Sequence, residues 1–234
     1  MTATLALALQ TRPDVPGFRR LFGFDAGISD ENVSDFALQR RRAESGGEQL
    51  PPHLHRIVTI AAVLRQADDQ LVLASFAGDG GDEAAQLTAL FALIEQHQPQ
   101  LVTWDGNTLP VLQHRALVHG LAAPAFCRLA ASETGHLDLS AALAPHSATN
   151  NVSLDELARL CGFAGRRGAH PEGLAEADAL ALYQLLQGFE QLRGELPQGD
   201  RQQALRALRH ALAAESDARW QALLAAWPAA PASA

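Results

Sequence analysis

The residues of this chain whose types and spacing could do chemistry are mainly carboxylates and arginines. Asp178 lies two residues after Glu176 in a helix-like segment, Asp138 lies in a His-x-Asp-Leu block, and Asp105 opens a tight polar loop. Carboxylate oxygens are the ligands that hard divalent cations prefer. Arg166 and Arg167 stand together between glycines, and two interpretations are open for them: phosphate contacts or a solvated loop.

Other kinds of site have little support in the sequence. His53 and His55 form a His-x-His pair beside two prolines, but no third ligand is near in sequence, so exposed loop residues are favoured over a metal site. The chain has no Gly-x-Ser-x-Gly motif, and without lysine it has no Gly-x-x-x-x-Gly-Lys loop. Cys127 and Cys161 show no paired metal-ligand spacing, which favours a reducing, cytoplasmic location.

Length and composition describe a globular chain with a full core. Its 234 residues are 47% hydrophobic and 19% charged, and no apolar run approaches the roughly 20 residues of a membrane span. The net charge of −8 argues against a protein that coats nucleic acid, although it allows local arginines in a cleft. All 18 basic residues are arginine, either through the codon bias of a GC-rich genome or through selection for bidentate phosphate contacts.

The elements that must position these residues follow an α/β order. Residues 4–11 alternate as a strand that Pro13 and Pro16 interrupt, 57–64 and 71–76 form a hairpin, and 101–104 form a further strand. Residues 137–143 fit either a strand end or a helix start. Caps and stops predict helices at about 30–44, 82–98, 110–120, 153–162, 173–193, 200–214 and 217–227.

This order predicts a mixed sheet flanked by helices, with three antiparallel strands on one side and parallel strands on the other. It fits a ribonuclease H-like architecture, although other mixed α/β folds fit as well. We expect a main domain over residues 1–195, a C-terminal helical hairpin over 196–227 and a tail over 228–234.

Several segments, taken in order from about residue 4 to 195, resemble a bacterial family of predicted 3′-5′ exonucleases related to the proofreading domain of family-B DNA polymerases. The resemblance lies in QTRPD at 10–14, residues 39–46, LP and HRIV at 50–58, residues 99–105, LPVLQHRALVHG at 109–120, LDELARLCG at 154–162, EAD at 176–178 and residues 189–194. It implies the ribonuclease H-like fold of the DEDD superfamily. It also implies two Mg²⁺ or Mn²⁺ ions held by four carboxylates.

Most of the implied catalytic residues are missing here. The Asp-x-Glu-Thr motif on the first strand, whose i, i+2 spacing points both carboxylates into one site, is replaced by Ala8 and Gln10. The Phe-Asp pair of the second motif is deleted, and Asp105 stands where the family has asparagine. Asp178 is kept, but the water-orienting tyrosine four residues earlier is Leu174.

These substitutions predict a degenerate exonuclease in which Ala8, Gln10 and Leu174 are vestigial positions and Asp178 is a vestigial metal ligand. Asp138 matches a family position near the site and is a further candidate ligand. We expect no bound cofactor and no membrane association.

The favoured function is a non-catalytic module that binds single-stranded DNA or RNA through Arg166, Arg167 and Trp104. The alternatives are an active metal-dependent exonuclease with relocated ligands and a subunit that binds a protein partner.

Overall fold

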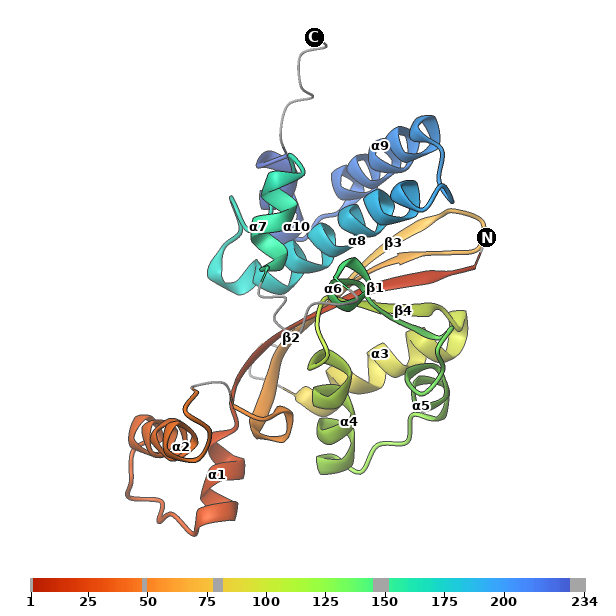
Figure 1. The fold of residues 1–234 in the computed structure, drawn as a ribbon. Helices are drawn as coiled ribbons and strands as arrows, with labels where there is room; N and C mark the ends of the chain where they lie inside the picture. The colour runs from red at the N-terminus through yellow and green to blue at the C-terminus, as the bar shows by residue number, and fades with distance from the viewer. Residues whose placement is uncertain (1, 48–49, 78–81, 145–151, 228–234) are drawn as a thin grey trace.

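The computed structural model describes residues 2–47, 50–77, 82–144 and 152–227, which form a five-stranded sheet in the order β3-β2-β1-β4-β5 (Figure 1). The strands are β1 (Thr4–Pro13), β2 (His55–Arg65), β3 (Leu71–Ala77), β4 (Gln100–Thr103) and β5 (His136–Asp138). β2 pairs antiparallel with both β1 and β3, whereas β1 with β4 and β4 with β5 are parallel. The predicted mixed sheet is confirmed, and the fold is α/β and ribonuclease H-like.

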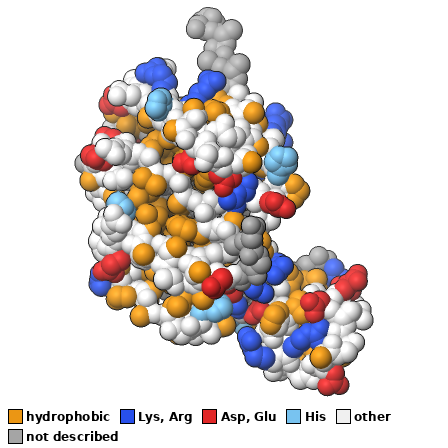
Figure 2. All heavy atoms as spheres, turned by 180° about the vertical axis from the view of Figure 1, so that it is seen from behind, with side chains coloured by type: hydrophobic (Ala, Val, Ile, Leu, Met, Phe, Trp, Pro, Cys, Tyr) orange, Lys and Arg blue, Asp and Glu red, His pale blue; other side chains and the backbone are white. Residues whose placement is uncertain are grey.

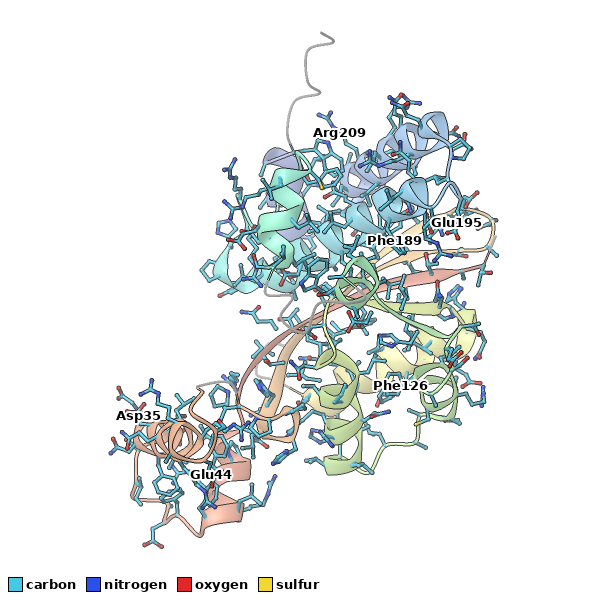
Figure 3. All side chains as sticks on the ribbon, in the orientation of Figure 1. Asp35, Glu44, Phe126, Phe189, Glu195 and Arg209 are labelled. Carbon is cyan, nitrogen blue, oxygen red and sulfur yellow. The ribbon has the colours of Figure 1, made fainter. Side chains whose placement is uncertain are left out.

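Alternation along β1 divides the interior into two cores, one on each face of the sheet. Leu5 and Leu7 face the core beneath α3 (Glu83–His97), α4 (Thr108–Val118) and α5 (Pro124–Ala130). Phe126 of α5 lies in this layer and packs on Phe91 with ring centroids 5.1 Å apart (Figure 3). Ala6 and Ala8 face the opposite core, which α7 (Leu154–Leu160) and α8 (Leu174–Leu192) cover. The period of two in the sequence therefore fixes which residues of β1 reach the candidate site.

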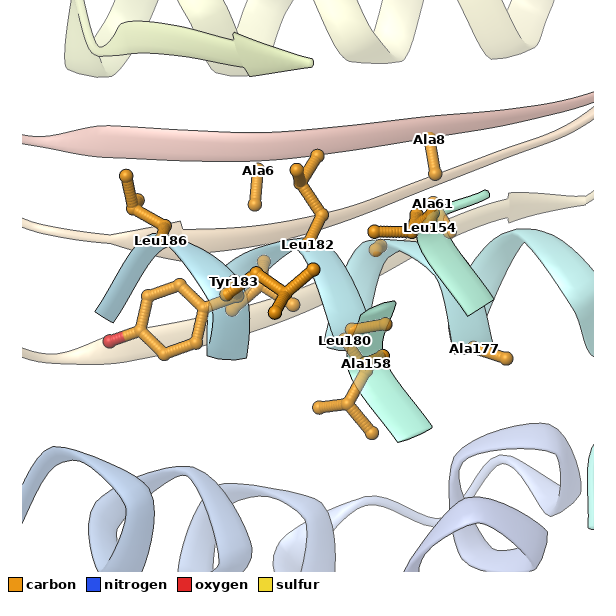
Figure 4. Packing of buried hydrophobic residues seen from close by; sticks show 14 of the residues in the cluster. Ala6, Ala8, Ala61, Leu154, Ala158, Ala177, Leu180, Leu182, Tyr183 and Leu186 are labelled. Atoms are coloured by element: carbon orange, nitrogen blue, oxygen red, sulfur yellow. The ribbon is translucent and has the colours of Figure 1, made fainter. Parts of the chain in front are cut away.

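Small side chains bring α8 close to the sheet. The first half of α8 buries alanines 175, 177, 179 and 181, and Leu182 extends towards β1. On the strand, Ala6 and Ala8 point back at this helix, as Figure 4 shows. Close packing of small residues places the start of α8, with Asp178, beside the middle of β1.

The helix boundaries follow their capping residues. Ser29, Asp82 and Ser153 each accept a hydrogen bond at the start of a predicted helix, and Ser153 forms the complete capping box. Gly46 ends α2 (Asp30–Ser45) with a φ of 71°, the left-handed conformation that suits glycine. Residues 137–143 combine both expected alternatives, because β5 ends at Asp138 and α6 (Leu139–Leu143) begins at the next residue.

Two helices were not predicted. One is α1 (Val15–Phe22), because Pro13 and Pro16 predicted only the end of the first strand. Asp14 caps this helix and Pro16 lies in its first turn, where proline is tolerated. The other is α5, which also begins with a proline.

Helices α1 and α2 form a projection, residues 14–47, that stands away from the rest of the molecule (Figure 1). The projection has a small core of its own around Phe18, Val33 and Leu50. Asp35 and Glu44 point outward from α2 (Figure 3). The short 3₁₀ helix η1 (Pro52–Leu54) leads back into β2.

The C-terminal helices α9 (Gln198–Ala214) and α10 (Ala218–Ala225) pack on the α8 side of the sheet. Leu212 and Trp220 are buried in the same core cluster as Ala8. The second 3₁₀ helix, η2 (Pro171–Gly173), precedes α8. The division into domains stays a prediction, and the expected tail, 228–234, lies outside the described residues. None of the described helices has both the length and the apolarity of a membrane span.

Candidate functional site

A cavity of about 400 Å³ lies between the middle of β1, the loop after β4, the start of α7 and the start of α8. The predicted site residues Ala8, Trp104, Arg166 and Asp178 all line it, together with Asp105 and Asp155. Gln10, Asp138, Arg167 and Leu174 do not line it. The structure thus brings together half of the predicted residues.

The β1 side of this cavity offers no charged ligand. Ala8 is 8% exposed and packs among the apolar residues of the α8 core (Figure 4). Gln10 uses its Nε2 to donate a hydrogen bond to the carbonyl oxygen of Pro171, 3.0 Å away, just before α8. Its Oε1 is buried without a hydrogen-bond partner among the described residues. Gln10 therefore ties β1 to η2 with a donor that a glutamate would lack.

Asp178, the acid that the resemblance assigns to the third motif, is paired with Arg166. The guanidinium donates from Nε to Oδ1 at 2.8 Å and from Nη2 to Oδ2 at 2.7 Å, a bidentate arrangement. Asp178 is largely buried, with 14% of its side chain exposed, whereas Arg166 is 51% exposed. The hydrogen bonds to Asp178 raise the pKa of Arg166 and outweigh the opposing effect of burial.

The loop that carries Arg166 is held by Asp155 on α7. The backbone N–H of Arg166 donates to Oδ1 of Asp155 at 2.7 Å, and Arg159 forms an ion pair with Oδ2 at 2.9 Å. Gly165 has a φ of 60°, and a Cβ at this position would lie 2.3 Å from Oδ1 of Asp155. Both its backbone conformation and this close approach require glycine. Arg167, the next residue after Arg166, is exposed.

Asp105 and Asp138 bind backbone N–H groups where helices begin. Oδ1 of Asp105 accepts hydrogen bonds from the N–H of Asn107 and from the N–H and hydroxyl of Thr108, at 3.0–3.1 Å, and so fixes the turn that leads into α4, whose N-cap residue is Asn107. Oδ1 of Asp138 accepts the N–H of Ala141 at 3.0 Å at the start of α6. These bonds give each carboxylate a structural role at a helix N-terminus.

The remaining predicted residues have packing roles. Trp104 is half-buried and packs against the α8 core while lining the cavity. Leu174 is the first residue of α8. Glu176 is fully buried on another side of the helix, where it accepts a hydrogen bond from Ser75 and pairs with Arg219 at 2.9 Å. Only the resemblance to the exonuclease family, and no local pattern, distinguished Asp178 from this structural acid.

The prediction that His53 and His55 are both exposed loop residues is wrong for His55. His55 is partly buried and begins β2, where its Nδ1 lies 3.0 Å from the hydroxyl of Thr11 and its Nε2 lies 3.0 Å from the carbonyl of Leu50. Both ring nitrogens are occupied, so His55 offers no free nitrogen to a metal. His53 is exposed and lies near His114, with ring centroids 6.0 Å apart.

A buried ionic network lies at the base of the projection, beside a second cavity of about 540 Å³. Arg115 pairs with Glu83 through two hydrogen bonds of 2.8 and 2.6 Å and with Asp14 at 2.6 Å. His119 and the N–H of Ile57 also bind Glu83, at 2.9 and 2.7 Å. Burial would raise the pKa of Glu83, but these hydrogen bonds outweigh it and lower the pKa. Through Asp14, the N-cap of α1, the network joins the projection to β2, α3 and α4, so its role is structural.

The donor set does not fit a two-metal centre. Within the described part of the chain, no three His, Cys, Asp or Glu side chains come close enough together to hold a metal ion. Two-metal hydrolysis needs several carboxylates converging on ions roughly 4 Å apart. Here the β1 positions carry no acid, and the acids around the cavity are bound to arginines or helix N-termini.

The model of one protein family, described as a predicted 3′-5′ exonuclease related to the exonuclease domain of PolB, matches residues 47–227. The chain belongs to this family. The match to the PolB-related exonuclease family includes Asp105, Arg166 and Asp178, and it runs through α9 and α10. It confirms the resemblance found in the sequence. The chain has no significant match among curated proteins or among solved structures.

Proposed function

We propose that this chain is a non-catalytic member of the PolB-related exonuclease family that binds single-stranded nucleic acid at the former catalytic cavity. The proposed loss of catalysis rests on one observation: both carboxylate oxygens of Asp178 accept hydrogen bonds from Arg166. Ala8, on the facing strand, has no donor atom with which to replace it. Family membership favours nucleic acid as the ligand.

Binding at this place has suitable groups to use. Trp104 offers an indole at the wall of the cavity, and base stacking on aromatic rings is tolerant of sequence. Arg166 and Arg167 lie at consecutive positions in the loop beside α8, where phosphate contacts need positive charge. Few arginines are involved and the chain is acidic, so we expect weak binding that falls as the salt concentration rises.

The test measures binding and cleavage in the same samples. Fluorescence anisotropy with labelled single-stranded DNA and RNA is recorded at low and high salt, followed by gel analysis of strand length after incubation with Mn²⁺. We expect binding that weakens as the salt concentration rises, and strands that are not shortened. When Arg166 and Arg167 are both changed to alanine, the slope of log affinity against log salt concentration should decrease in magnitude by about two at most. Shortened strands would support an active exonuclease instead, and unchanged binding in the double variant would exclude this loop.

A second candidate function is binding of a protein partner through the projection. Among the described residues, α1 and α2 and the loop between them expose Leu21, Ile28 and Phe36 to 61%, 36% and 41%. Phe36 also packs edge-on against Phe22 and Phe24. Figure 2 shows hydrophobic, basic and acidic side chains on one face of the projection. Among the described helices after Asp200, by contrast, no large hydrophobic residue is exposed. If neither the labelled single-stranded DNA nor the RNA binds at low salt, this second function is favoured.

A further inference from the structure

The carboxylate of Asp178 needs a positive partner because it is largely removed from water. Its side chain is 14% exposed, and an unpaired charge in such a place is costly. In a two-metal exonuclease the divalent ions would supply this charge. In this chain the guanidinium of Arg166 supplies it, with both of its contacts shorter than 2.9 Å.

We infer that Arg166 is a built-in cation that has taken the place of the divalent metal at Asp178. The substitution is chemically reasonable because the planar guanidinium matches a carboxylate bidentately and keeps its charge at every physiological pH. The cation is also covalently attached, so its occupancy does not depend on metal concentration. A metal ion could reach Asp178 only by displacing it.

The loop geometry supports a dedicated position for this arginine. The backbone of Arg166 is fixed by Asp155, and the positive φ and close approach of Gly165 bring the loop to α7. The backbone N–H of Arg167, one residue later, donates to the carbonyl oxygen of Ala164 at 3.2 Å within the same loop, and among the described residues its side chain pairs with no acid. The two neighbours therefore differ in role although they share a charge.

The pairing also leaves part of the guanidinium available. Nε and Nη2 point at Asp178, whereas Nη1 has no hydrogen-bond partner among the described residues. With Arg166 lining the cavity, its remaining N–H groups are suited to a phosphodiester oxygen. This step rests on the proposed function, and it makes nucleic-acid binding independent of divalent metal.

The metal alone is the first probe, because it tests the inference without any nucleic acid. Melting temperatures are measured with 10 mM Mn²⁺ and with EDTA for the natural protein, Arg166→Ala, the matched control Arg167→Ala, and Arg166→Ala combined with Asp178→Asn. We expect the melting temperature of Arg166→Ala to rise by about 3–6 °C in Mn²⁺ if the acids that the substitution uncovers bind the ion with a Kd of about 1 mM. The other three proteins should shift by less than about 1 °C.

Two results would overturn the inference. One is a natural protein whose melting temperature rises with Mn²⁺ as much as that of Arg166→Ala. The other is an Arg166→Ala variant that ignores Mn²⁺ or keeps its full shift when Asp178→Asn is added. Because Arg166 is half exposed, we expect each of these variants to fold, and circular dichroism spectra check that they do.

The second probe is a labelled single strand in EDTA or Mn²⁺. We expect equal affinity of the natural protein in both buffers, and a loss of affinity in Arg166→Ala that Mn²⁺ partly restores. Binding that requires Mn²⁺ in the natural protein would refute metal independence. Absence of binding under all conditions would refute the proposed function, while the melting experiment would still decide the role of Arg166.

Discussion

Returning an acid to the first strand is the most direct test of the geometry around Asp178. Ala8 is 8% exposed and lines the same cavity as Asp178 and Arg166, so Ala8→Asp places a carboxylate beside an existing ion pair. The new acid is repelled by Asp178 but attracted by Arg166. These two terms largely cancel, and the remaining cost is desolvation, which we expect to be about 1–3 kcal/mol.

Removing Arg166 changes this balance. Two carboxylates about 5 Å apart repel by roughly 3 kcal/mol at an effective dielectric constant of about 20. Arg166→Ala alone should cost about 1–2 kcal/mol, because it leaves the largely buried Asp178 without its partner, whereas the arginine side chain itself is half exposed to solvent. We therefore expect the double variant to lose about 1–3 kcal/mol more than the sum of the single variants.

Urea unfolding of the natural protein, Ala8→Asp, Arg166→Ala and the double variant gives the coupling energy between positions 8 and 166 directly. The matched control is the same cycle with Arg167→Ala in place of Arg166→Ala. Mn²⁺ should recover most of the extra loss in the double variant through linkage. Additivity within about 0.5 kcal/mol would mean that Ala8 does not face the Asp178 pair. That result would contradict both the predicted alternation of β1 and the packing of α8.

Three further outcomes are expected. Gln10→Glu should destabilise the fold by about 1–2 kcal/mol in thermal or urea unfolding, because a carboxylate cannot donate to the carbonyl of Pro171. Arg115→Leu should cost about 3–5 kcal/mol, since it leaves buried acids without a partner. Because the pKa of Glu83 is lowered in the folded protein, the stability that this network provides is complete above the ordinary pKa of 4.5. It is lost as the pH falls through the lowered pKa. Acid unfolding curves of the natural protein should show this loss, and those of Arg115→Leu should not. Trp220→Ala should cost about 3–5 kcal/mol, with a single unfolding transition, because this side chain is buried in the main core.

The sequence was informative where a local pattern determines the structure. Alternation of leucine and alanine placed Ala8 on the α8 face of β1, and capping residues such as Ser153 located helix starts to within a residue or two. The resemblance to an exonuclease family supplied the topology, because strand order is not readable from periodicity. The fold was therefore predictable, whereas the loss of acids from the first motif stays a prediction, because the family match begins at residue 47.

Contacts between residues distant along the chain were not predictable. The pairing of Arg166 with Asp178 spans a loop and two elements, so no spacing rule indicates it. The sequence placed Asp105 where the family has asparagine, and only its three hydrogen bonds to Asn107 and Thr108 show that it fixes the turn before α4. Glu176 and Asp178 are two residues apart on one helix, but this spacing turns them to different sides, one into the core and one into the cavity.

On the inference that Arg166 takes the place of a metal ion, Ala8, Arg166 and Asp178 form one compatible set. An acid at position 8 favours a bound metal, and a bound metal excludes the guanidinium of Arg166 from the carboxylate that both require. Conversely, once Arg166 is anchored through Asp155 and Gly165, the acid at position 8 loses its metal partner, and alanine packs better against α8. Each arrangement is stable, whereas a mixture of the two leaves a buried charge without a partner. Single reversions at Ala8 or Gln10 therefore lower stability without rebuilding a metal site, and only variants that also remove Arg166 regain affinity for divalent cations.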